Sequence, residues 1–185
     1  MKTHILLAAL PLALLSAACD DPSGPGGTDD ASRIAISYTG GVSGSFAAEG
    51  DPRLTSAPNT QTFAIATRGS DGTVEVTAYR QAGGARFDLA GITIPAAAVG
   101  ERAVELCPGE TCSSVFLALD LGQATGSQAA HSCQLQTGTI RVTALTATRV
   151  TGTVSGSGFC LPREGGGEVP FQITSGTFAV DVMQH

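Results

Sequence analysis

The 185-residue chain is acidic and sparsely charged, with ten Lys and Arg residues against sixteen Asp and Glu, a formal net charge of −6, and only 14% charged residues. Nucleic acids and anionic lipid surfaces are bound by clustered Lys and Arg side chains. The sequence contains no basic run, so this composition argues against both kinds of partner.

Residues 1–18 have the layout of a bacterial export signal. Lys2 supplies a positive charge, residues 5–15 are continuously apolar, and Ser16, Ala17 and Ala18 are small. The apolar run of about 14 residues would form a helix of roughly 21 Å, shorter than the ~30 Å hydrocarbon core of a bilayer. We therefore predict a cleaved signal peptide rather than a membrane-spanning helix.

The sequence Leu-Ser-Ala-Ala-Cys at 15–19 resembles the lipobox of bacterial lipoproteins, although Ser16 stands where that family usually has Leu. The resemblance implies that the Cys19 thiol receives a diacylglyceryl group and becomes the new N-terminus. Two or three acyl chains anchor a protein firmly, so the expected location is the cell envelope, attached to the membrane. The alternative is a secretory signal cut after Ala18. Asp20 resembles an inner-membrane retention signal, a rule that differs between bacterial groups.

Residues 19–33 are predicted to be the lipid anchor and a flexible tether. Their sequence holds four aspartates, two prolines and three glycines, with almost nothing apolar to offset the entropy of ordering. The aspartates do not follow the calcium-loop pattern, so a solvated linker is the preferred interpretation. Residues 34–185 are then long enough to form a single domain with one core.

Within residues 34–185 the apolar side chains alternate with polar ones, which is typical of half-buried strands. The alternation is clear at 34–39, 74–79 and 140–143, whereas the more apolar segment 115–121 is predicted to be a central strand covered on both faces. We therefore predict an all-β domain, an antiparallel sandwich or barrel of about 8–10 short strands, stapled by disulfides.

Glycine-rich turns separate the predicted strands. The segments at 38–44 and 68–76 are predicted to be hairpins, and 163–170 a hairpin tip. Residues 173–178 could be a turn or part of a long strand with a bulge at Gly176. The segment 94–104 leaves room for one helical turn between Pro95 and Gly100.

The aromatic residues are assigned mainly to the core. Tyr38 and Tyr79 are the candidates for an exposed contact. The phenylalanines expected in the core are Phe46, Phe63, Phe87, Phe116, Phe171 and Phe178.

Four cysteines follow Cys19, an even number that indicates disulfides in an exported chain. Cys107 and Cys112 enclose a Pro-Gly turn that brings them together, which leaves Cys133 to pair with Cys160. A zinc site is the alternative, but the spacing of the four cysteines fits it poorly.

No catalytic motif is recognisable. His131 is neither part of a metal-binding H-E-x-x-H pattern nor followed by one, and we interpret it as a loop histidine beside a disulfide rather than a general base. Asp88, Asp120 and Asp181 lie in strand-like segments, where a pair across a cleft could serve a hydrolase. Outward-facing carboxylates are the more ordinary interpretation. No metal or cofactor is expected.

Residues 137–182 resemble the C-terminal part of β-rich bacterial lipoproteins with no assigned activity, through recurring Gly-Thr-strand units. This resemblance implies only a β-rich fold and an envelope location. The sequence therefore favours a non-enzymatic envelope module that binds a ligand or partner or has a structural role, with a hydrolase built from scattered carboxylates as the alternative.

Overall fold

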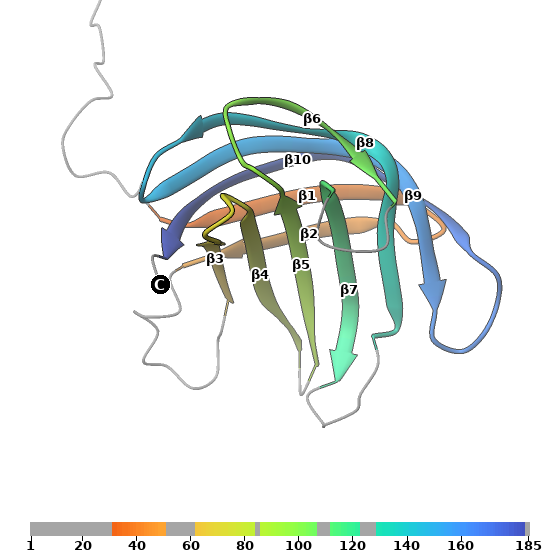
Figure 1. The fold of residues 1–185 in the computed structure, drawn as a ribbon. Helices are drawn as coiled ribbons and strands as arrows, with labels where there is room; N and C mark the ends of the chain where they lie inside the picture. Colours follow the sequence, from red (N-terminus) through yellow and green to blue (C-terminus); the bar gives the residue numbers. More distant parts are fainter. Residues whose placement is uncertain (1–30, 51–61, 84–85, 107–111, 123–128, 184–185) are drawn as a thin grey trace, which may run out of the picture.

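A computed structural model describes residues 31–50, 62–83, 86–106, 112–122 and 129–183, and within these ranges all regular structure is β-strand (Figure 1). Ten strands follow one another along the chain. They are β1 (Arg33–Gly40), β2 (Gly44–Glu49), β3 (Thr62–Arg68), β4 (Val74–Gly83), β5 (Arg86–Ile94), β6 (Gly100–Glu105), β7 (Ser114–Gly122), β8 (His131–Leu145), β9 (Arg149–Pro162) and β10 (Val169–Met183).

The strands form two layers that join at two corners (Figure 1). One layer runs in the order β2-β1-β10-β9-β8-β6, and the other runs β3-β4-β5-β7. The layers join where β10 pairs with β3 and where β8 pairs with β7. All pairings are antiparallel except the short β10–β3 pairing. The predicted all-β antiparallel fold of about 8–10 strands is confirmed, although β8, β9 and β10 have 15, 14 and 15 residues and are not short.

The space between the layers is filled by the inward side chains of the alternating strands. The predicted phases of the first and fourth strands are confirmed, because Ile34 and Ile36 of β1 and Val74 and Val76 of β4 are all buried. These residues belong to one hydrophobic cluster, to which both layers contribute side chains. Burial of such aliphatic side chains, about 1.5–3 kcal/mol each, is the main force that holds the layers together.

The expected placement of the aromatic residues is wrong for half of them. Phe46, Phe171 and Phe178 are in the core as predicted. Phe63 and Phe87 are instead half-buried on the outer face of the β3-β4-β5-β7 layer, where they pack on either side of Tyr79. The strand register explains the difference, because Ala64 and Ala66 take the inward positions of β3 and alternation places Phe63 on the outer face. Tyr38, expected to be exposed, is buried in β1.

The prediction that 115–121 is covered on both faces is also wrong. Val115, Leu117 and Leu119 point into the core, but Phe116 faces outward and is 40% exposed. Its ring lies on Gly91 of the neighbouring β5, where an added Cβ would meet the Phe116 Cε1 atom at 2.0 Å. The missing side chain of Gly91 thus provides the space for an outward aromatic ring.

The predicted turns are largely confirmed. Hairpins connect β1 to β2, β3 to β4 and β9 to β10, and the tip at 163–168 is the glycine-rich segment. The residues around Gly176 form one continuous strand, β10, whose register shifts between Ile173 and Gly176. The segment 94–104, where one helical turn was possible, contains the end of β5, a turn at Pro95 and Ala96, and the first residues of β6. In the described ranges no helix is long and apolar enough to cross a bilayer.

A disulfide joins Cys133 of β8 to Cys160 of β9, as predicted. The two residues lie directly opposite each other in the ladder, with Cα atoms 3.9 Å apart. Cys112 is also disulfide-bonded. Its predicted partner, Cys107, lies outside the described residues, as does the predicted lipidation site, Cys19.

Candidate functional site

A cavity of about 310 Å³ opens at the end of the sandwich where β7 and β9 end and β5 and β8 begin. Four separate parts of the chain supply its polar groups, so it exists only in the folded domain. Its lining consists of Arg86, Asp120, Ala130, His131, Pro162, Arg163 and Glu164.

His131 is the first residue of β8 and lies at the edge where three strands meet. It is paired with Leu119 of β7 on one side and with Pro162 of β9 on the other. Its Nδ1 atom is buried and has no hydrogen-bond partner among the described residues. The Cys133–Cys160 disulfide lies two residues further along both strands and fixes their spacing beside the cavity. His131 lies beside the disulfide as predicted, but it is the first residue of a strand and not a loop residue, and it also lines the cavity.

Asp120 enters the cavity from the end of β7 through an unusual backbone conformation. Its φ angle is +57°, in the left-handed region that non-glycine residues rarely adopt. The Arg86 guanidinium holds both the Asp120 carboxylate and its backbone oxygen. The Asp120 N–H donates a hydrogen bond of 2.8 Å to Oδ1 of Asp88. This conformation coincides with a register shift between β5 and β7 beside Asp88, which is the geometry of a β-bulge.

Asp88 stands behind the cavity, inside the sandwich, and is only 5% exposed. Its Oδ2 atom accepts hydrogen bonds from Nε (3.2 Å) and Nη2 of Arg80. The same guanidinium donates to the Ser45 backbone oxygen at 2.9 Å and lies 5.2 Å from the centre of the Phe46 ring. One partly buried ion pair therefore links β2, β4 and β5, and through Asp120 it reaches β7.

Arg163 and Glu164 follow β9 and form the outer wall of the cavity. The Arg163 backbone N–H donates to the Ala130 oxygen at 2.9 Å, which places the start of the β9–β10 connection beside His131. Neither of these two charged side chains has an ion-pair partner within the described ranges. The sequence offered no signal for them, because they lie in a segment whose composition indicates only a turn.

The three aspartates singled out in the sequence do not form a catalytic pair across a cleft. Asp88 and Asp120 are neighbours, but the oxygens of Asp88 are occupied by Arg80 and by the Asp120 N–H, so only Asp120 lines the cavity. Asp181 lies at the other end of the domain, bound to Arg149. Among the described residues, no three His, Cys, Asp or Glu side chains are grouped so that they could hold a metal ion.

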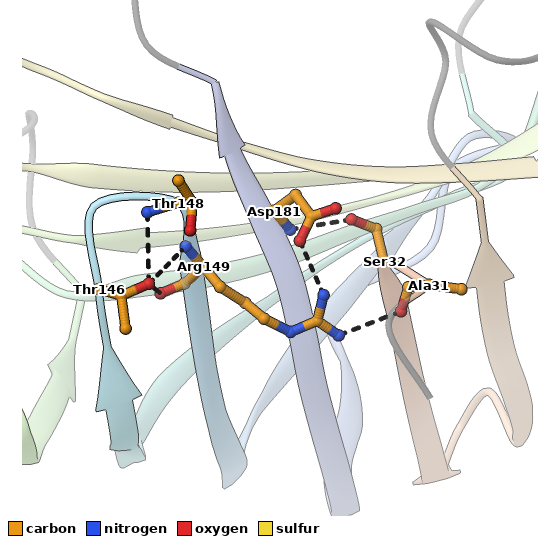
Figure 2. A network of polar contacts seen from close by, with 6 residues as sticks. All are labelled: Ala31, Ser32, Thr146, Thr148, Arg149 and Asp181. Carbon is orange, nitrogen blue, oxygen red and sulfur yellow. Dashed lines mark hydrogen bonds and ion pairs between the residues drawn. The ribbon is translucent and has the colours of Figure 1, made fainter. Parts of the chain in front are cut away.

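The other end of the sandwich holds a second polar network, where the chain enters the domain (Figure 2). Nη1 of Arg149 donates to Asp181 at 2.7 Å, and Nη2 donates to the Ala31 oxygen at 3.3 Å. The buried Ser32 hydroxyl accepts a hydrogen bond of 2.8 Å from the Asp181 N–H. The β8–β9 hairpin and β10 thus hold the segment that leads into β1. β1 begins at Arg33, one residue before the predicted domain boundary.

No family model, curated protein or solved structure matches this chain. The site is therefore interpreted from its own geometry. That geometry defines an all-β, disulfide-linked sandwich with a polar cavity at one end and the entry of the chain at the other.

Proposed function

We propose that this chain is an exported lipoprotein, anchored in the cell envelope through Cys19, and that its domain is a non-enzymatic module that presents a ligand-binding cavity away from the membrane. Residues 1–18 would be removed, and residues 19–33 would connect the lipid to the domain. The resemblance of residues 15–19 to a lipobox supports the anchor.

The observation that carries this proposal is the opposite placement of the chain entry and the cavity. Arg149 and Asp181, which hold Ala31 and Ser32, lie beside the β8–β9 hairpin. His131 and Pro162, which line the cavity, form the pair at the other end of the same two strands. At about 3.3 Å per residue, the 15 residues of the curved β8 trace a path of roughly 45 Å between the two ends. A domain tethered at its entry would therefore hold the cavity well away from the membrane.

The arrangement of the carboxylates supports a binding role more than catalysis. Hydrolysis by paired carboxylates needs two of them on either side of the scissile bond. Here Asp88 and Asp120 are each held by an arginine, and only Asp120 lines the cavity. The hydrolase alternative has one observation in its favour, which is that Asp120 and His131 line the same cavity.

The anchor is tested with Cys19→Ala. We expect the variant to lose its membrane fraction in detergent partitioning while its domain stays folded by circular dichroism, because the anchor and the core are separate parts of the chain. Ser16→Leu, which creates the residue usual in a lipobox, is the matched control and should stay in the membrane fraction. An unchanged membrane fraction for Cys19→Ala would contradict the proposal.

A further inference from the structure

The cavity at the start of β8 contains polar groups whose bonding capacity the described part of the protein leaves unused. The Arg163 and Glu164 side chains line the cavity, are exposed, and carry opposite charges without an ion pair in these ranges. A ligand with one charge of each sign would pair with both of them.

We propose that the cavity binds a small zwitterion with the chemistry of a free amino acid, with a carboxylate and an ammonium group on one carbon. The carboxylate is bound by the Arg163 guanidinium, and the ammonium group by the Glu164 carboxylate, with Asp120 in the same lining. This inference rests on the proposed binding function and names its ligand.

The charge of the lining selects for a zwitterion. Arg86 and Asp120 neutralise each other through their ion pair. Arg163 and Glu164 add one charge of each sign, so the lining has no net charge when His131 is neutral. A phosphate would meet two carboxylates, and a polyamine would meet two guanidinium groups, so both are disfavoured by like-charge repulsion. A ligand with one charge of each sign has a partner for both.

The size and rigidity of the cavity fit the same ligand. A volume of about 310 Å³ lies at the lower limit of small-molecule sites, which favours a ligand of a few heavy atoms. The walls are fixed by the Cys133–Cys160 disulfide, by the Arg86–Asp120 ion pair and by the backbone bond between Arg163 and Ala130. Walls held in this way lose little conformational freedom when a ligand binds.

The test uses the full-length protein, purified in a mild non-ionic detergent, and isothermal titration with millimolar glycine, alanine and serine. Acetate and methylamine, which carry the two charges separately, and inorganic phosphate are the comparison ligands. We expect saturable binding of at least one amino acid, and about tenfold or more weaker binding of acetate and methylamine because each lacks one charged contact. Binding of none of the amino acids, or equal binding of acetate, would overturn the inference.

Two variants separate the roles of the charged residues. Arg163→Ala should weaken amino-acid binding about tenfold or more, and Glu164→Ala should weaken it while improving acetate binding, because the lining then has a net positive charge. Glu168→Ala, an exposed change on the same hairpin and outside the cavity, is the control and should bind normally. Equal effects of Glu168→Ala and Glu164→Ala would overturn the assignment. The membrane fraction of the same preparations tests the proposed anchoring separately.

Discussion

At the scale of single residues, the partly buried Arg80–Asp88 ion pair explains how a polar end forms on an apolar sandwich. Both residues lie on the core-facing side of their strands. Arg80 follows the buried Ala78 on β4 by two residues, and Asp88 precedes the buried Ala90 on β5 by two residues. Every charged oxygen of Asp88 has a partner, which is the condition under which a buried carboxylate is tolerated. Removing Asp88 leaves the Arg80 charge, which is 27% exposed, without its ion-pair partner.

We therefore expect Asp88→Ala to lower the free energy of unfolding by about 1.5–3 kcal/mol, because the remaining Arg80 charge keeps some contact with solvent. Urea denaturation followed by circular dichroism measures the loss. The double variant Arg80→Met/Asp88→Leu replaces both charges with apolar groups and should be more stable than Asp88→Ala, because no uncompensated charge remains. A double variant less stable than the single one would show that the pair itself, rather than the orphaned charge, dominates.

Tyr38 makes the stability depend on pH in the alkaline range. Burial, and after it the negative charge of Asp88, raise the pKa of Tyr38 above 10.0, while Arg80 acts in the opposite direction. The folded protein then keeps the phenolic proton at a pH where the unfolded chain releases it. This contribution to stability is complete below pH 10 and is lost as the pH rises through the folded-state pKa.

Tyr38→Phe should remove that alkaline loss, since phenylalanine has no proton to release. Unfolding free energies measured at several pH values between 8 and 11 should fall more steeply in the native sequence than in the variant. Parallel curves for the two proteins would contradict the role given to Tyr38.

At the scale of elements, alternation predicted where strands lie but not always which face meets the core. The phase is right for Ile34 and Val74, where the apolar residues alternate with polar ones. It fails at Phe63 and Phe116, because apolar residues lie on both faces of these strands. In β3 the alanines take the inward positions, and in β7 the aliphatic residues do, so both phenylalanines face outward. The bulge at Asp120 has no sequence signature, since it depends on the partner strand.

The cavity could be predicted only in part for a related reason. The sequence indicates His131 as a candidate because histidines are few, and Asp120 because it is a carboxylate in a strand-like segment. Arg163 and Glu164 reach the same place through the pairing of β8 with β9, which brings Pro162 opposite His131. This long-range pairing is a property of the fold and cannot be obtained from local composition.

The β8–β9 element depends on its disulfide. The Cys133–Cys160 bridge spans a sequence separation of 27. In the loop-closure model such a bridge contributes roughly 3.5 kcal/mol, against roughly 2 for a bridge between Cys107 and Cys112. The Cys133→Ala/Cys160→Ala double variant should therefore melt at a lower temperature than the Cys107→Ala/Cys112→Ala variant. Mass mapping of non-reduced peptides checks the pairing, and a peptide linking Cys107 to Cys133 would defeat it.

At the scale of the whole molecule, the two layers close on each other through a short seam between the last strand and the third. Only Val182 and Met183 of β10 pair with β3, opposite Ala66 and Thr67. The Val182 N–H also donates to the Thr148 oxygen at 2.8 Å, beside the network that holds the chain entry. The seam thus joins both layers and the entry segment at one place.

Val182 is buried in the core, so Val182→Asp would place an unpaired carboxylate in the seam. We expect the free energy of unfolding to fall by about 3 kcal/mol or more, with the loss of a buried aliphatic side chain added to the cost of burying the charge. Thr177→Asp, an exposed change on the same strand, is the matched control and should cost no more than about 1 kcal/mol. Thermal melts of the two variants measure the difference. Equal melting temperatures would mean that the layers are held together without the seam, by their apolar faces and by the β7–β8 corner alone.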